Sequence, residues 1–234
     1  MKLSIIVPCY NEEKNIPLIL ERFNSVINRE DIEVILVNNG SKDNSEKVIW
    51  KLLPRYKFAK TMLVDINQGY GYGILQGLKL ASGEYIGWTH ADMQTDPQDV
   101  ITALEIIEKH ENSKYLFVKG NRKNRPLFDQ FFTSGMSLFE SLYLGKSLYD
   151  INAQPNIFHR SFYESWIDPP YDFSLDLYAL YLARKNNFNV ERFNVIFPER
   201  IHGESSWNSG FLSKWKFIKR TIGFSIKLKR GGIR

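Results

Sequence analysis

Short runs rich in Val, Ile and Leu alternate with segments of helical periodicity, and this alternation constrains the fold more than any other feature. The strand-length runs are residues 2–8, 33–37, 60–65, 84–89 and 114–120. Helical spacing relates Ile16, Ile19, Leu20, Phe23 and Val26 and, after Pro97, relates Ile101, Leu104 and Ile107. Asp43 and Glu46 form a capping-box pattern that opens a further helix. The alternation predicts an α/β fold of three layers with a mainly parallel sheet.

The second half of the chain continues the same pattern. From Leu127 the residues are aromatic and helically spaced, residues 174–185 are predicted to form a helix, and a final strand is expected near residues 193–201. Separate domains are normally joined by a Pro-, Gly- or Ser-rich linker, and the sequence has none here. We therefore predict one domain over residues 1–204.

The positive charge is concentrated in a tail, residues 205–234. The formal net charge is +5, yet residues 1–204 carry 23 basic and 26 acidic side chains, and the tail carries eight basic and no acidic ones. This distribution argues against nucleic acid as a partner. The tail is predicted to be an amphipathic helix with an apolar stripe of Phe211, Trp215, Ile218, Ile222 and Ile226 beside Lys216, Lys219, Arg220, Lys227 and Arg230. Such a helix either lies on an anionic membrane surface or packs on the domain with its charges in water.

Polar loops follow the first four predicted strands. They read CYNEE (9–13), NNGSKD (38–43), INQGYGYG (66–73) and HADMQTD (90–96). Asp and Asn are natural turn formers, so the last loop alone is equally typical of an ordinary turn. In parallel α/β sheets, however, ligands bind beyond the carboxyl ends of the strands. Four such loops in succession therefore favour a binding site.

Several site chemistries are excluded. The glycines at 69, 71 and 73 lack the last glycine of a dinucleotide fingerprint, because Ile74 stands there, and they follow the third strand rather than the first. There is no Walker loop, no serine nucleophile elbow and no zinc motif. The single cysteine, Cys9, cannot form an internal disulfide, and no apolar run reaches the ~18 residues of a membrane span. We expect a cytoplasmic protein, soluble or peripheral on the cytoplasmic face of a membrane.

The motifs together resemble family 2 inverting glycosyltransferases. They are SIIVPCYNEEKNI, VILVNNGSKDNS, NQGYGYGILQGLKLASGEYIGWTHADMQTDP and ERIHGESSW, which extend from Ser4 to about Trp207. Within that family the chain looks most like the dolichol-phosphate mannosyltransferase and polyprenyl-phosphate glycosyltransferase branch. The resemblance implies the Rossmann-like A-type fold of nucleotide-diphospho-sugar transferases.

The resemblance also implies a nucleotide site at the first three loops. Its expected residues are Pro8, Tyr10, Glu12, Asn38, Asn39, Ser41, Asn67 and Gly71, with Asp92 from the fourth loop. The second loop usually reads Asp-Asp-Gly-Ser, whereas this chain has two asparagines. An amide donates as well as accepts hydrogen bonds, so the preferred base can differ from that of the usual members.

The fourth loop corresponds to the family's Asp-Ala-Asp metal motif. The resemblance places His90, Asp92 and Gln94 at the ligand positions, and alternate residues leaving a strand project to the same side. A divalent cation there would bridge the diphosphate of the donor. Imidazole at position 90 favours Mn²⁺ over Mg²⁺. Alternatively, His90 hydrogen-bonds the sugar or a neighbouring loop without a metal.

Three further residues are carried over as catalytic candidates. Arg122 and Arg200 stand where this branch places arginines near donor or acceptor phosphates, although either can instead form a surface ion pair, and Arg125 is a rival to Arg122. Asp176 matches an acid of the acceptor-side helix. Asp172 either compensates for Ser174, a position that is often acidic, or caps that helix.

The resemblance therefore predicts an inverting glycosyltransferase. It would transfer a sugar from a UDP- or GDP-sugar to a polyprenyl phosphate or a glycan precursor. A hydroxyl acceptor would need a base, for which Asp176 is the candidate, whereas a phosphate would not. The changes at Asn38, Asn39 and His90 leave open a catalytically impaired homologue that binds nucleotide sugars.

Overall fold

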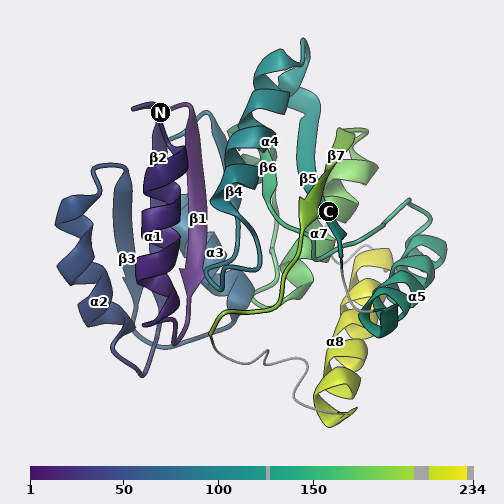
Figure 1. Ribbon diagram of the computed structural model, residues 1–234. Coiled ribbons are helices and arrows are strands. Elements are labelled where there is room, and N and C mark those ends of the chain that lie inside the picture. Colours follow the sequence, from purple (N-terminus) through teal and green to yellow (C-terminus); the bar gives the residue numbers. More distant parts are fainter. Residues whose placement is uncertain (125–126, 203–210, 231–234) are drawn as a thin grey trace.

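A single seven-stranded sheet forms the centre of the protein (Figure 1). The computed structural model describes residues 1–124, 127–202 and 211–230. The strands are β1 (Leu3–Cys9), β2 (Ile32–Asn39), β3 (Ala59–Val64), β4 (Tyr85–Trp88), β5 (Leu116–Lys123), β6 (Asn156–His159) and β7 (Asn189–Ile196). Their order in the sheet is β3-β2-β1-β4-β6-β5-β7.

The sheet is mainly parallel, as the sequence predicts. Strands β1 to β4 are parallel, β5 and β7 are parallel to each other, and β6 is antiparallel to β4 and β5. Strand β6 was not predicted, because four buried residues give too short a pattern. Strand β7 begins at Asn189, earlier than predicted, since its exposed residues obscure the apolar pattern there.

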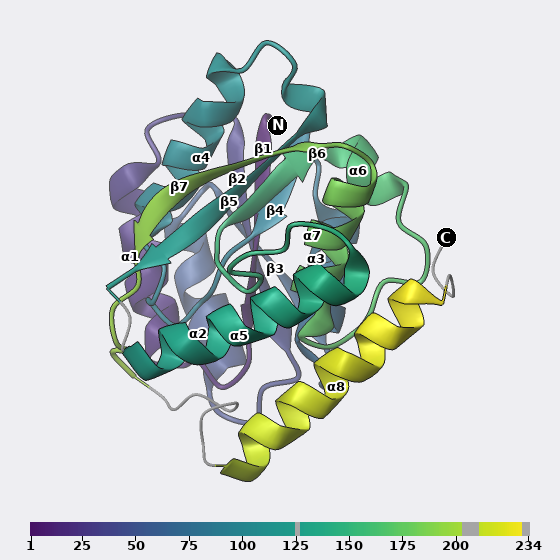
Figure 2. The same cartoon turned by 90° about the vertical axis from the view of Figure 1, so that its right-hand side faces the viewer.

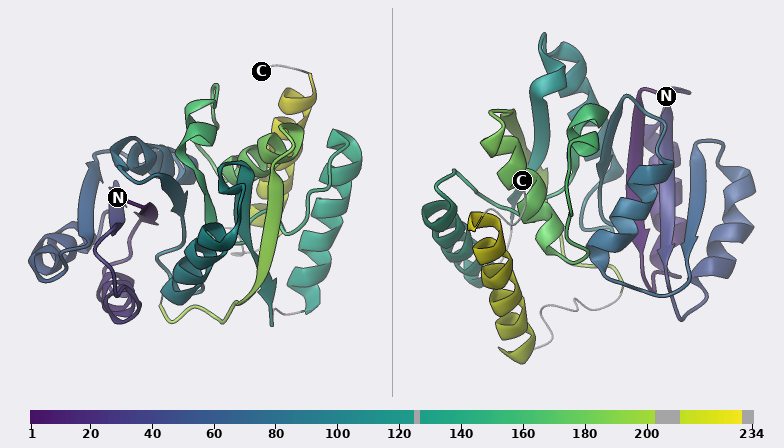
Figure 3. Two further views of the ribbon diagram at one scale, coloured as in Figure 1. Left: turned by 90° about the horizontal axis from the view of Figure 1, so that it is seen from above. Right: turned by 180° about the vertical axis from the view of Figure 1, so that it is seen from behind.

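Helices cover both faces of the sheet (Figure 3). They are α1 (Asn15–Val26), α2 (Ser45–Leu52), α3 (Tyr70–Leu80), α4 (Pro97–Lys109), α5 (Leu127–Leu144), α6 (Arg160–Glu164), α7 (Ser174–Lys185) and α8 (Phe211–Lys229), with 3-10 turns at Leu53–Arg55 and Ser113–Tyr115. Helices α1, α2 and α4 share one apolar core with one face, and α3, α6 and α7 share the other core with the opposite face. This is the predicted arrangement of three layers.

Two predicted helix starts have different outcomes. Helix α4 begins at Pro97, and the side chain of Asp96 accepts a hydrogen bond from the backbone N–H of Gln98 at 2.9 Å. The capping box at Asp43 is wrong: the N-cap of α2 is Asn44, and Asp43 accepts from the backbone N–H of Ser45 just inside the helix. Asp43 forms an Asx turn with Ser45 instead of a capping box, because its one short side chain cannot serve both arrangements.

The tail contains helix α8, which lies beside α5 (Figure 2). Its buried residues are Thr221, Ser225 and Leu228, and it also contacts α7. The predicted stripe is offset from this face: Ile218, Ile222 and Ile226 are half-buried and Trp215 is exposed. The side chains of Phe211 and Lys216 lie outside the described part, as do Arg125 and residues 203–207 of the last motif. The helix thus packs on the domain while part of its apolar stripe faces outward.

Candidate functional site

The loops after β1 and β2 are hydrogen-bonded to each other. Ser41 accepts a hydrogen bond from the backbone N–H of Asn11 at 3.0 Å, and Asn11 accepts one from the backbone N–H of Lys42 at 2.8 Å. Ser45 accepts from the backbone N–H of Glu12 at 2.9 Å. These contacts place Glu12 and Ser41, both predicted site residues, on adjoining loops at the carboxyl edge of the sheet.

The two asparagines that follow β2 are buried and hold the surrounding loops. Asn38 accepts a hydrogen bond from the backbone N–H of Ser41 at 3.2 Å. Asn39 donates through Nδ2 to the carbonyl of Gly69 at 3.0 Å, beneath the start of α3. An aspartate could accept the first hydrogen bond but could not donate the second. The hydrogen bond to Gly69 therefore explains why position 39 carries an amide rather than a carboxylate in this chain.

We expect Asn39→Asp to destabilise the protein by about 1–3 kcal/mol, because a buried carboxylate would face the carbonyl of Gly69 without a donor. Asn38→Asp, which keeps its acceptor, is the matched control and should cost less. Urea unfolding of both variants measures the difference. Equal stabilities would show that the hydrogen bond to Gly69 does not determine the residue at position 39.

Asp92, Gln94 and Arg200 form a connected cluster at the end of β4. Arg200 Nη2 lies 2.8 Å from Asp92 Oδ2, and Arg200 Nε donates to Gln94 Oε1 at 3.0 Å. Gln94 in turn donates to the carbonyl of Pro198 at 3.0 Å and its backbone N–H donates to Asp92 Oδ1 at 3.1 Å. The structure thus brings together predicted residues that are more than 100 positions apart in the sequence.

Glu12 adjoins this cluster. Burial raises the pKa of Glu12, and the nearby Asp92 acts in the same direction, while the hydrogen bond from Asn15 and the charge of Arg200 oppose the rise. Asn15 Nδ2 lies 2.6 Å from Glu12 Oε2 and 3.4 Å from the carbonyl of His202. The loop of residues 197–202 therefore closes against the loops that follow β1 and β4.

His90 is enclosed beside a ring stack. The ring of Tyr70 lies 6.0 Å from the ring of His90 and 4.7 Å from that of Phe173, stacked on both. Burial lowers the pKa of His90, which the carboxylates of Asp92 and Asp176 oppose. A neutral imidazole is the form that binds a metal ion.

His90, Asp92 and Gln94 could hold a divalent ion only together with further ligands. Within the described residues, no three His, Cys, Asp or Glu side chains are grouped so that they could hold a metal ion. His90 can offer one nitrogen and Asp92 one carboxylate, whereas the amide oxygen of Gln94 is engaged by Arg200. Diphosphate oxygens would have to complete the shell.

Asp176 is buried behind this site rather than open to it. Its side chain is 2% exposed, and Oδ1 accepts hydrogen bonds from Trp88 Nε1, Gln154 Nε2 and Asn156 Nδ2, each at 3.0 Å. Burial raises the pKa of Asp176, and the charges of Lys119 and His90 and the donors Trp88 and Gln154 oppose the rise. Burial is the largest of these influences, so the raised pKa means that Asp176 binds a proton more readily than an exposed aspartate does.

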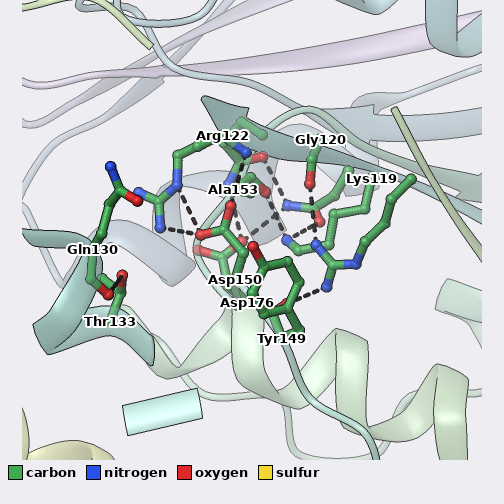
Figure 4. A network of polar contacts seen from close by, with 12 residues as sticks. Lys119, Gly120, Arg122, Gln130, Thr133, Tyr149, Asp150, Ala153 and Asp176 are labelled. Atoms are coloured by element: carbon green, nitrogen blue, oxygen red, sulfur yellow. Dashed lines mark hydrogen bonds and ion pairs between the residues drawn. The ribbon is translucent and has the colours of Figure 1, made fainter. Parts of the chain in front are cut away.

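Lys119 fixes the direction of these amides, as Figure 4 shows in part. Its ammonium is fully buried and donates to the carbonyl of Ala153 at 2.6 Å and to Asn156 Oδ1 at 2.5 Å. Because lysine only donates, the amide nitrogen of Asn156 must face Gln154 Oε1 and Asp176. Lys119, Gln154 and Asn156 were not predicted as site residues. Only Lys119 has a signal in the sequence, as a lone charged residue within the apolar run LFVKG.

Arg122 is buried in an ion pair with Asp150. The two side chains are 7% and 6% exposed, and Asp150 accepts from the backbone N–H and Nε of Arg122, each at 2.9 Å, and from Nη2. The guanidinium also lies over the ring of Phe197, 5.2 Å from its centroid. The alternative of a surface ion pair is wrong, because this pair is internal.

The remaining predicted residues have mixed positions. Tyr10 is exposed and Pro8 is half-buried. Asn67 accepts a hydrogen bond from the backbone N–H of Gly69, and a Cβ at Gly71 would lie 2.6 Å from the carbonyl of Pro170, so Gly71 is a close-packing position. Asp172 accepts from the backbone N–H of Ser174 and so forms an Asx turn at the start of α7. It is not the N-cap, because that position is Phe173 and has no side-chain cap.

The chain is similar in sequence to curated glycosyltransferases. The chain is 25% identical over 215 residues to undecaprenyl-phosphate 4-deoxy-4-formamido-L-arabinose transferase of Serratia proteamaculans, covering 88% of this chain and 63% of that one. It is 34% identical over 120 residues to the human dolichyl-phosphate beta-glucosyltransferase, covering 47% of this chain and 36% of that protein. The chain therefore spans about a third to two thirds of the length of such relatives.

A solved structure shares the fold. Glucosyl-3-phosphoglycerate synthase of Mycobacterium tuberculosis, in complex with Mn²⁺, UDP and glucosyl-3-phosphoglycerate, superposes with a TM-score of 0.72 at 15% identity, covering 97% of this chain and 79% of that one. The likeness confirms the predicted A-type glycosyltransferase fold.

The family itself follows from the sequence model described as Glycosyl transferase family 2, which matches residues 4–168. This match covers more than half of the chain and contains all four polar loops that surround Asp92. On this evidence the protein belongs to glycosyl transferase family 2.

Proposed function

We propose that the protein is an inverting glycosyltransferase that moves a sugar from a nucleotide-diphospho-sugar to a polyprenyl phosphate. The observation that carries the proposal is the cluster of Asp92, Gln94 and Arg200 at the carboxyl ends of β1 and β4. An arginine held by a carboxylate and an amide is suited to binding a diphosphate in a fixed orientation. Positive charge there would stabilise the leaving nucleotide as the glycosidic bond breaks.

On the donor side, Tyr10, Glu12 and the loop of Asn38, Asn39 and Ser41 would hold the nucleoside of a UDP- or GDP-sugar. The support is that the loops after β1 and β2 are joined by hydrogen bonds into one surface beside Glu12. The buried amides of Asn38 and Asn39 would act by shaping this surface, since their own side chains are enclosed.

His90 and Asp92 would hold a divalent cation together with the diphosphate. Bound there, the ion would act as a Lewis acid at the leaving phosphate. One imidazole and one carboxylate favour Mn²⁺ over Mg²⁺. Binding of the ion should require nucleotide, because this chain supplies too few ligands alone.

On the acceptor side, a pocket lies between β5, α5, α7 and α8. We call it the α5–α8 pocket; its walls include Arg122, Met136, Glu140, Ile151, Phe173 and Leu177. Phe173 links the pocket to His90 through the stacked ring of Tyr70. The burial of Asp176 favours a phosphate acceptor over a hydroxyl, because a phosphate is already an anion and needs no base.

Peripheral membrane binding would bring the enzyme to such a lipid. Among the described residues, no helix is both long and apolar enough to cross a membrane. Helix α5 exposes Phe131, Leu138 and Leu142 by 81%, 62% and 75%, and Trp215 of α8 is 57% exposed. The cations Lys219 and Lys227 of α8 are exposed as well, as is Arg230 just after the helix. This combination suits an anionic interface.

We expect Leu142→Glu and Trp215→Glu each to weaken co-sedimentation with anionic liposomes several-fold, because each places a carboxylate where lipid would lie. Both sites are exposed, so stability should change little. Trp50→Glu, at an exposed tryptophan of α2, is the matched control and should bind like wild type. Full binding by both test variants would exclude α5 and α8 as the contact.

Nucleotide binding and transfer test the function directly. We expect UDP or GDP with Mn²⁺ to raise the melting temperature, and the matching nucleotide sugar to glycosylate undecaprenyl phosphate in detergent. Binding without turnover for any donor and lipid phosphate would support the impaired homologue suggested by Asn38, Asn39 and His90. Absence of nucleotide binding would refute both.

A further inference from the structure

Helices α5 and α8 meet at a buried acid that the proposed reaction does not use. Glu140 of α5 is fully buried and lines the α5–α8 pocket. Its Oε2 contacts Ser225 Oγ of α8. Its other oxygen, Oε1, is also buried and has no hydrogen-bond partner among the residues that the structure describes.

The hydrogen bonds at this contact depend on whether Glu140 is protonated. Ser225 Oγ lies 3.0 Å from the carbonyl of Thr221 as well as next to Glu140. A serine hydroxyl has one proton, so it cannot donate to both. If Glu140 is protonated, it donates to Ser225 and Ser225 donates to Thr221. If Glu140 is ionised, one acceptor loses its donor and the charge is left with at most one hydrogen bond.

Among the residues that the structure describes, no cation compensates the charge of an ionised Glu140. Arg122 lines the same pocket but is paired with Asp150. On α8, Arg220 is directed to Asp172, and Lys229 lies over the ring of Tyr143. The wall contributed by α7 is uncharged, with Ser174 and Leu177. Burial accordingly raises the pKa of Glu140 to about 7, against the effect of the Ser225 hydroxyl.

We propose that Glu140 is a proton-operated clasp that holds α8 on α5 and closes the α5–α8 pocket. Protonated Glu140 completes the chain of hydrogen bonds to Ser225 and Thr221 and keeps the helices together. Ionised Glu140 leaves a buried charge at the contact and favours separation of α8 from α5. The clasp depends on the packing of α8 alone, whatever donor or acceptor the protein takes.

The direction of the pH effect follows from the raised pKa. The pKa of Glu140 is about 7 in the packed state, against an ordinary 4.5 when the contact is open. The packed state therefore binds the proton more tightly than the open state. The clasp is therefore complete below about pH 4.5 and is lost as the pH rises through 7. Between pH 5 and pH 8 the opening of α8 should increase by roughly one to two orders of magnitude.

Hydrogen exchange of the α8 backbone tests the clasp. We expect protection over residues 218–229 to fall with pH in wild type, after correction for intrinsic exchange, and to be nearly independent of pH in Glu140→Gln. Glu105→Gln, at an exposed position of α4, is the matched control and should behave like wild type. The same pH dependence in wild type and Glu140→Gln would overturn the proposal.

A second measurement keeps the proposal testable if Glu140→Gln does not fold. The carboxyl carbon of Glu140 in the wild-type protein should titrate near pH 7 by NMR. Titration near the ordinary value of 4.5 would mean that the acid is ionised within the closed contact, and the clasp would be refuted.

Discussion

Arg122→Met should lower the free energy of unfolding by about 3–5 kcal/mol, because it removes the guanidinium that is paired with the buried carboxylate of Asp150. Asp150 now accepts hydrogen bonds from the backbone N–H and the guanidinium of Arg122, and the charge of Arg122 is the main influence that holds the pKa of Asp150 down against burial. Methionine retains most of the side-chain volume, so the loss of stability is due to the removed charge rather than to a cavity. Chemical denaturation at pH 7 measures it.

An exposed ion pair provides the control for this loss. Arg22 contacts Asp96 at 2.9 Å, with side chains 39% and 46% exposed, and Arg22→Met should cost at most about 1 kcal/mol. The double variant Arg122→Met, Asp150→Leu should recover much of the lost stability, since it removes the stranded charge. If Arg122→Met is no more destabilising than Arg22→Met, the buried ion pair of Arg122 and Asp150 does not stabilise the fold.

Arg200→Ala should reduce turnover by about ten- to a hundredfold while leaving the melting temperature nearly unchanged. Under the proposed function, the variant would remove a charge-assisted contact to phosphate of about 1.5–3 kcal/mol. The side chain of Arg200 is 25% exposed, so its truncation opens Asp92 to water, and Asp92 keeps the hydrogen bond from the backbone of Gln94. The effect on folding should therefore be smaller than that of Arg122→Met, whose ion pair is closed to water on both sides. Steady-state kinetics and thermal denaturation of the same preparations separate the two effects.

Arg200→Lys distinguishes charge from geometry. Lysine restores the positive charge but cannot contact Asp92 and Gln94 together as the planar guanidinium does. We expect an intermediate rate, between those of wild type and Arg200→Ala. Wild-type turnover in Arg200→Ala would remove this residue from the reaction.

The strand pattern allowed much of the fold to be predicted. Runs such as residues 34–37 are buried on both faces, so their apolar character is unbroken and predicts a parallel strand. Strand β6 has four residues and leaves no such signal. The polar loops were also visible, because each one follows directly on a strand, and the contact of Asp92 with Arg200 agrees with the site that they indicated.

The network around Asp176 could not be predicted in the same way. Lys119, Gln154 and Asn156 come from β5, from the segment before β6 and from β6 itself, and their contacts depend on side-chain directions that only the folded sheet fixes. A lysine within LFVKG gives no indication in the sequence that its ammonium is fully buried. The contact of Glu140 with Ser225 is likewise set by helix packing across 85 positions.

The reversed direction of β6 has a consequence for how this family can vary. Strand β5 ends at Lys123 and β6 begins at Asn156, and because β6 is antiparallel to β5 both points lie on the same edge of the sheet. The intervening segment, which includes α5, therefore leaves the sheet and returns to it at the edge that carries Asp92. Insertions or replacements within it need not disturb the registers of β1 to β4. Such an arrangement lets the segment that includes α5 change in length or sequence while the loops that follow β1 to β4 keep their positions.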